Sequence, residues 1–183
     1  MKGFSELELV ITAPEAYAAA LALRSRARLT LGALTQLISQ SESHVLLSVP
    51  FIQSGDEVAA PIFCALQSVL RKGVSVDVVS TRSGLEAVQG RLLTQGTKGR
   101  LRLFRPQVNI EDERRIGSHA KICVSDGEHA YVGSANLTMP GLNEHFEIGL
   151  LVHGEVARQI WGFWKLLMDS ELLVESSIGE GIE

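Results

Sequence analysis

Cysteine, proline and aromatic residues are scarce in this chain of 183 residues, which has 2 Cys, 5 Pro and 5% aromatic side chains. Cys64 and Cys123 are far apart in the sequence and belong to no paired motif, so we expect neither a disulfide framework nor a cysteine-bound metal site. The chain has no apolar run of about 18 residues and no basic start followed by an apolar block. We therefore expect a soluble, cytoplasmic protein that does not associate with membranes.

Charge is unevenly distributed along the chain. The net charge is -4, yet most basic residues precede position 122 and most of the later charges are acidic. The densest basic stretch, residues 91–115, comes just before the most informative motif. Such a run favours contact with nucleic acid, although it is also typical of a solvated face, and residues 111–113 interrupt it with three acids.

Three segments are expected. Residues 1–41 read as an N-terminal helical segment, with one or two amphipathic helices over 15–23 and 29–39. Residues 42–170 read as the main domain, and 171–183 as an acidic tail.

The main domain alternates strands with helices and then forms a hairpin. Strands are predicted at 44–49, 74–80, 100–104, 118–124, 130–133 and 147–152. Helices are predicted at 55–71, with a start near Pro61 as the alternative, at 83–95, with Ser83 as the N-cap, and at 154–169. Asp126-Gly127 is a tight-turn signal. This order predicts an α/β fold in which helices flank a mixed β-sheet in α/β/α layers. Trp161 and Trp164 are expected to anchor the last helix in the core.

A polar motif spans the hairpin. Residues 119–136 read H-x-K-x4-D-x6-G-S-x-N. Strand alternation over 118–124 directs His119 and Lys121 to one face, with Asn136 available from the next strand. An imidazole flanked by an ammonium and an amide is typical of nucleophilic attack on an anionic phosphoryl group.

These residues resemble the signature of the phospholipase D superfamily. The residues that carry the resemblance are His119, Lys121, Asp126, Gly133, Ser134 and Asn136, with Glu147 in the Asn-Glu-His-Phe-Glu run. The resemblance implies a phospholipase D-like fold and a phosphodiesterase. Asp126 and Gly133 are interpreted as structural members of the motif, since a turn aspartate bonds backbone groups.

The remaining motif residues receive chemical roles. The expected catalytic residues are His119, Lys121, Asn136 and Glu147, and Ser134 joins Lys121 and Asn136 as a phosphate ligand. At the position of Glu147, family members have a carboxylate that bonds the catalytic histidine. The other histidines (His44, His129, His145 and His153) receive no role. Because no carboxylate cluster has metal-ligand spacing and ammonium groups supply the charge, we expect no metal and no cofactor.

The chain holds one copy of the motif, whereas the chemistry needs one histidine to attack and a second to protonate the leaving group. A homodimer that joins two copies of His119 across a two-fold axis supplies both. Enzymes of this superfamily with one motif per chain are built this way.

The substrate is less clearly indicated. Our first hypothesis is a metal-independent nuclease acting on DNA or RNA. The layout also looks similar to the phospholipase-D-like component of the bacterial DISARM phage-defence system, which implies defence proteins as partners. The alternatives are a non-catalytic dimer that binds nucleic acid or scaffolds a defence complex, and a phospholipase, for which the apolar loop at 137–142 is the nearest lipid contact.

Overall fold

The computed structural model of the chain describes residues 7–107 and 118–176, apart from residues 54, 56, 93 and 94. The strands are β1 (Leu7–Thr12), β2 (Arg28–Leu29), β3 (His44–Ser48), β4 (Ser75–Val79), β5 (Leu101–Pro106), β6 (Lys121–Ser125), β7 (His129–Gly133), β8 (Glu147–His153) and β9 (Leu173–Glu175). The α-helices are α1 (Glu15–Ser25), α2 (Thr30–Ser39), α3 (Ala60–Lys72), α4 (Arg82–Arg91) and α5 (Glu155–Asp169), with a 3-10 turn at Glu57–Ala59 and a π-helical turn at Pro140–Glu144.

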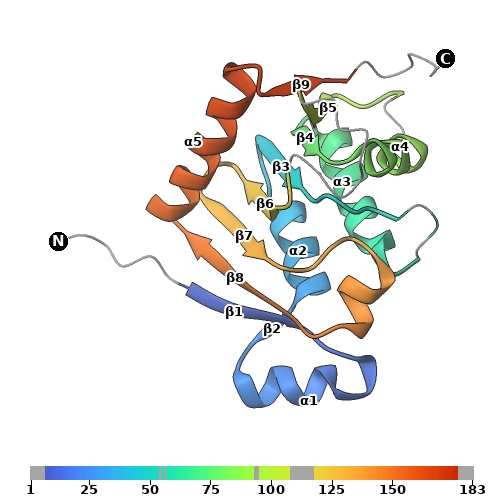
Figure 1. The fold of residues 1–183 in the computed structure, drawn as a ribbon, viewed down its shortest axis with the longest axis vertical. Coiled ribbons are helices and arrows are strands. Elements are labelled where there is room, and N and C mark those ends of the chain that lie inside the picture. The colour runs from blue at the N-terminus through green and yellow to red at the C-terminus, as the bar shows by residue number, and fades with distance from the viewer. Residues whose placement is uncertain (1–6, 54, 56, 93–94, 108–117, 177–183) are drawn as a thin grey trace.

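The described strands form one mixed sheet in the order β2-β1-β8-β7-β6-β3-β4-β5-β9. Strands β3, β4 and β5 are parallel and are joined by α3 and α4, whereas β6, β7, β8 and β1 pair antiparallel. Helices α2, α3 and α4 bury the larger apolar cluster on one face, and α5 buries a second cluster on the other (Figure 1). The predicted α/β fold with a mixed sheet flanked by helices is confirmed.

The ends of the chain contribute more to the sheet than the sequence indicated. Helices α1 and α2 confirm the two predicted N-terminal helices, but the segment 1–41 also supplies β1, which pairs with β8 over six positions. The segment read as an acidic tail supplies β9, which pairs with β5. Residues 177–183 lie outside the described part.

One helix start and one strand start differ from the predictions. Helix α3 begins at Ala60, after the 3-10 turn, which confirms the alternative start near Pro61. The N-cap of α4 is Thr81 rather than Ser83, and the Thr81 hydroxyl accepts the Gly84 N–H at 3.4 Å. Strand β6 begins at Lys121, so His119 lies just before it.

A buried ion pair joins the three parallel strands under α5. Asp77 of β4 is fully buried and accepts hydrogen bonds from Arg102 Nε at 2.7 Å and Nη2 at 2.5 Å. The Asp77 carboxylate also lies 2.9 Å from His44 Nε2, and the His44 ring packs edge-on against Trp161 of α5, with centroids 4.5 Å apart. Burial raises the pKa of Asp77, but the hydrogen bonds from His44 and Arg102 outweigh it and hold the pKa below 3.8. This network fastens α5 to the sheet.

Asp77→Asn should lower the free energy of unfolding at neutral pH by about 3 kcal/mol, because it leaves the Arg102 guanidinium without its carboxylate. A depressed folded pKa gives stability that is present above the ordinary value, near 3.8, and is lost as pH falls towards the folded pKa. The variant should therefore show a shallower loss of stability below about pH 4, measured by urea denaturation across pH. Glu86→Gln, which breaks the exposed Arg82–Glu86 pair, is the control. Equal losses of unfolding free energy in Asp77→Asn and Glu86→Gln would contradict the stabilising role given to the buried Asp77–Arg102 pair.

Candidate active site

The candidate site lies at the edge of the sheet where β6 begins, β7 ends and β8 begins. Strand register pairs Lys121 with Gly133 and Gly133 with Gly149. Because these three strands are antiparallel, the residues just before β6, just after β7 and at the start of β8 meet at this edge. His119, Ser134, Asn136 and Glu147 hold those positions beside Lys121.

His119 and Lys121 form the centre of the site. The Lys121 ammonium lies 3.1 Å from His119 Nδ1 and 3.0 Å from Nε2, and it donates to the His119 carbonyl at 2.9 Å. The His119 side chain is exposed, whereas Lys121 is buried. Burial lowers the pKa of Lys121, and the charge of Glu147 opposes this shift. A partly desolvated cation beside an accessible imidazole attracts an anionic substrate.

Glu147 is held by Ser134 rather than by His119. The Ser134 hydroxyl donates to Glu147 Oε2, and the Ile148 N–H donates to Ser134 Oγ at 3.2 Å. The other carboxylate oxygen lies 3.9 Å from His145 Nδ1. Among the hydrogen bonds of the described residues, none joins Glu147 to His119, so the structure brings these two residues to one edge without the predicted contact.

Asn136 lies in a turn that is pinned to the segment after β3. The next residue, Leu137, donates its N–H to Phe51 and accepts the Gln53 N–H, both at 3.1 Å. Gly141 packs so closely that an added Cβ would lie 2.5 Å from the Asn136 carbonyl oxygen. The Asn136 Oδ1 atom is buried and has no hydrogen-bond partner among the described residues. With the oxygen inside, the amide nitrogen is the end available to a ligand.

Comparison with known proteins identifies the family. Residues 34–165 match the model described as "Cardiolipin synthase, PLD-like domain". This chain belongs to the phospholipase D-like family. It is 28% identical over 159 residues to DISARM protein DrmC of Bacillus paralicheniformis; the match covers 82% of this chain but only 58% of that relative's length.

Solved structures of low sequence identity share the phospholipase D-like fold. NucT from Helicobacter pylori has a TM-score of 0.64 at 15% identity, with 93% of this chain and 100% of that chain covered. Nuc from Salmonella typhimurium, a phospholipase D family member, also has a TM-score of 0.64 at 15% identity and covers 96% of this chain and 100% of its own. Phosphatidylserine synthase from Haemophilus influenzae has a TM-score of 0.62 at 10% identity, covering 96% of this chain and 41% of that chain.

In this phospholipase D-like chain, the motif aspartate lies at the other end of β6 from His119. Five extended residues, roughly 16 Å, separate the two ends of the strand. The Asp126 carboxylate accepts the backbone N–H groups of Glu42, Ser43 and His44 at 2.8 to 2.9 Å. Asp126 therefore holds the connection between α2 and β3.

A substitution tests this structural contact. Burial raises the pKa of Asp126, but the hydrogen bonds from His44, Ser43 and Glu42 outweigh it and lower the pKa overall. Asp126→Asn should reduce the free energy of unfolding at neutral pH by about 2 kcal/mol, because charged acceptors bind N–H groups more strongly than amides do. The loss should shrink as pH falls from about 3.8 towards the lowered folded pKa, because the wild-type carboxyl protonates over that range and loses its advantage over the amide. Urea denaturation across pH measures this loss of stability. Asp169→Asn, at an exposed position, is the control. A loss in Asp126→Asn that does not change with pH would contradict the role given to the Asp126 carboxylate.

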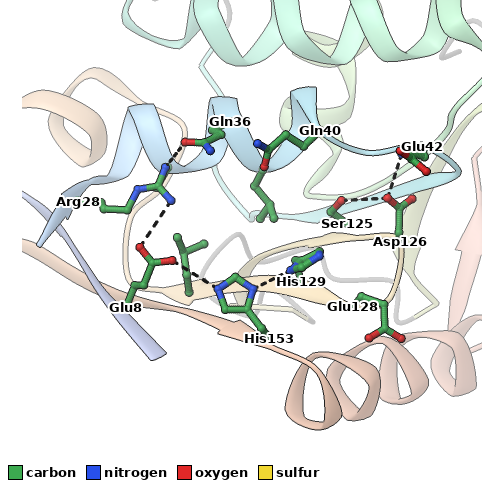
Figure 2. A pocket seen from close by; sticks show the side chains of 13 residues that line it. Glu8, Arg28, Gln36, Gln40, Glu42, Ser125, Asp126, Glu128, His129 and His153 are labelled. Carbon is green, nitrogen blue, oxygen red and sulfur yellow. Dashed lines mark hydrogen bonds and ion pairs between the residues drawn. The ribbon is translucent and has the colours of Figure 1, made fainter. Parts of the chain in front are cut away.

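A polar pocket of about 400 Å³ lies at the same end as Asp126, away from His119 (Figure 2). In it, the Nδ1 atoms of His129 and His153 are 2.7 Å apart, and His153 Nε2 lies 3.5 Å from Glu8. Glu8 in turn lies 3.8 Å from Arg28, which donates to Gln36 at 2.6 Å. This chain of contacts links β7, β8, β1, β2 and α2, so it fastens the N-terminal segment to the core.

Part of the predicted basic stretch is occupied by other contacts. Arg102 is paired with Asp77, and Arg100 lies 3.2 Å from Glu175. Arg91 packs over the Phe63 ring at 4.5 Å. Arg105 of the same stretch is exposed, whereas Arg114 and Arg115 lie outside the described residues. Contacts within the chain therefore engage only part of the basic stretch that favoured nucleic acid.

Within the described residues, no group of three His, Cys, Asp or Glu side chains is arranged to hold a metal ion. No helix there has both the length and the apolar character needed to cross a bilayer.

Proposed function

We propose that this chain is a metal-independent phosphodiesterase, a nuclease that hydrolyses DNA or RNA through a phosphohistidine intermediate in a homodimer. The observation that carries the proposal is the Lys121 ammonium, 3.0 Å from the accessible His119 ring, at the edge shared with Ser134 and Asn136. A nucleophile and a cation in this arrangement match an anionic phosphoryl group. The fold shared with NucT and Nuc supports nucleic acid as the substrate class.

The first step forms a bond between an imidazole nitrogen of His119 and phosphorus. As the bond from phosphorus to the leaving oxygen breaks, the partner's His119 donates a proton to that oxygen. In the second step the partner's His119 takes a proton from water, and the resulting hydroxide attacks phosphorus. The phosphorus–nitrogen bond breaks, and both imidazoles return to their first state.

The surrounding groups stabilise charge and orient the ring in this proposal. Lys121 and Asn136 hold the non-bridging oxygens, and Ser134 adds a hydroxyl donor. Glu147 is the carboxylate that accepts the remaining N–H of His119 and fixes its tautomer. Its effect on the pKa of Lys121 supports a position within reach of the site. For that contact to form, Glu147 exchanges its bond with Ser134 for one with an imidazole.

An exposed apolar surface beside the site supports the homodimer. This surface, the α5–β8 face, consists of Val132, Ile148, Leu150, Val156 and Phe163, which are 39 to 63% exposed. It includes an open apolar groove between α5 and strands β7 and β8. Ile148 follows Glu147 directly in β8, and the two side chains point to opposite faces of the sheet, so the α5–β8 face reaches the same end of the sheet as the site from the other side. A second copy covering it would remove apolar area from water and bring a second His119 close.

Leu150→Glu together with Phe163→Glu should convert the dimer to monomer and abolish turnover, because two carboxylates would be buried at the interface. Analytical ultracentrifugation measures the mass. Leu23→Glu is the matched control, since Leu23 on α1 is 81% exposed and lies outside this face. A double variant that remains an active dimer, or a wild-type monomer that turns over, would contradict the proposed assembly.

The nuclease activity is tested with single- and double-stranded DNA and RNA in EDTA. His119→Ala should reduce cleavage by roughly 10³-fold or more, as expected for loss of a nucleophile. His129→Ala, at the opposite end of the sheet, should keep the wild-type rate. Cleavage that survives in His119→Ala, or that requires a divalent metal, would contradict the proposed chemistry.

Two alternatives have separate support. The similarity to DISARM protein DrmC and the net charge of -4 favour a non-catalytic dimer that binds nucleic acid or scaffolds a defence complex with partner proteins. Binding of DNA or RNA without turnover would support it. The fold shared with phosphatidylserine synthase favours action on phospholipid. Hydrolysis of phosphatidylcholine vesicles, with nucleic acid left intact, would support that reading.

A further inference from the structure

The edge that holds the candidate site continues along the carboxyl ends of the parallel strands β3, β4 and β5. Strand β3 pairs antiparallel with β6, so these carboxyl ends lie beside the start of β6, where His119 and Lys121 are. Ligands of open α/β sheets commonly bind outside the carboxyl ends of parallel strands. The proposed chemistry uses only β6, β7, β8 and their turns, so the rest of this edge has no role in it.

Phe51 lies between the motif turn and the start of α4. Its carbonyl accepts the N–H of Leu137, the residue after Asn136, at 3.1 Å. The carbonyl of the preceding residue, Pro50, accepts the Thr81 hydroxyl at 2.7 Å. These two hydrogen bonds fix the Phe51 backbone beside the site, while the Phe51 side chain is 42% exposed.

Two arginines continue this edge beyond Phe51. Arg82 is the first residue of α4, and its side chain is 68% exposed. On the next strand, the Phe104 carbonyl accepts the Ser80 N–H at 3.2 Å, which places Arg105 beside the end of β4. The Arg105 side chain is exposed. One aromatic ring and two guanidinium groups therefore follow one another along the edge that begins at the site.

Arg105 and Lys121 lie on the same face of the sheet. Leu103 of β5 and Cys123 of β6 belong to the apolar cluster under α2, α3 and α4. Because side chains two residues apart in a strand share a face, Arg105 and Lys121 both lie on this side. Strands β5 and β6 are three strand spacings apart, about 14 Å, a distance that a few nucleotides of one strand span.

An exposed aromatic ring beside guanidinium groups is typical of a site for single-stranded nucleic acid. A base stacks on a ring only when the face of the base is free, and in a duplex the neighbouring base pairs cover that face. Guanidinium groups then bind phosphates of the same strand. Arg82 lies 3.7 Å from Glu86, but both side chains are exposed, so a phosphate can replace this weak ion pair.

We propose that the edge from Phe51 to Arg105 binds the strand on one side of the scissile phosphate, so that the site takes single-stranded nucleic acid. Phe51 stacks on the base next to the site, and Arg82 and Arg105 bind phosphates further along the strand. The inference rests on the proposed function, because it takes nucleic acid as the substrate of the site at His119.

Binding is measured by fluorescence anisotropy in EDTA, with a labelled single-stranded oligodeoxythymidine and a duplex of the same length. All variants are made in the His119→Ala chain, so that the probe stays intact. Phe51→Leu keeps an apolar side chain but removes the aromatic face, and it should weaken single-strand binding roughly five- to hundredfold. Phe51→Tyr keeps the ring and should bind as the parent does. Since Phe51 is exposed, both variants should keep the Tm of the parent.

The salt dependence of binding tests the arginines. Arg82→Gln and Arg105→Gln should each reduce the slope of log K against log salt concentration by about 0.7, the contribution of one phosphate contact to a single strand. Arg71→Gln removes the same charge at an exposed position on the last turn of α3, at the opposite edge of the sheet, and should leave the slope unchanged.

Several results would overturn the inference. They are an absence of single-strand binding, equal or tighter binding of the duplex, unchanged affinity in Phe51→Leu, or salt slopes for Arg82→Gln and Arg105→Gln that match that of Arg71→Gln. Because binding is measured without turnover, the nuclease can fail separately. A wild-type protein that shows these binding properties but cleaves neither DNA nor RNA would contradict only the proposed hydrolysis.

Discussion

The hydrogen-bond ladder that joins β6, β7 and β8 is the constraint on which the site depends. Its register sets Lys121 beside Gly133 and Gly133 beside Gly149. A slip of one residue would turn each side chain to the opposite face of the sheet. Residues that approach the same edge from three different strands then share one surface, although they are spread from position 119 to 147. The arrangement of the candidate site is therefore a property of strand pairing, and the loops only complete it.

The ends of the ladder are specialised for different tasks. At one end, the buried Lys121 ammonium lies beside the exposed His119 imidazole, an arrangement that suits an anion. Gly133 and Gly149 pack against Tyr131 at the same end. At the other, Asp126 binds three backbone N–H groups, and the His129–His153 pair connects to the N-terminal strand through Glu8. The motif that looks continuous in sequence thus combines a chemical half and a structural half, separated by the length of β6.

The sequence predicts the parallel half of the fold and the motif edge well, because strong apolar strands and fixed spacing are local signals. It misses β1, whose pairing with β8 spans most of the chain and whose two buried side chains, Val10 and Thr12, are too few to show a strand pattern. It misses β9 because three residues are too few to show the alternation of apolar and polar side chains that marks a strand. The partner of Glu147 was also not predictable: Ser134 reaches it only through the β7–β8 register. The packing of buried Tyr131 against Gly133 and Gly149 was not predictable either, because these two glycines become neighbours only in the folded sheet.

Subunit mixing tests the central claim most directly, namely that one reaction centre uses His119 from both protomers. Wild-type and His119→Ala chains are unfolded together, refolded in varied ratios and assayed for cleavage. If each centre needs two imidazoles, activity follows the square of the wild-type fraction, so an equal mixture keeps about one quarter of the wild-type rate. Activity that falls in simple proportion to the wild-type fraction, leaving about one half in the equal mixture, would show that each protomer works alone and would contradict the account.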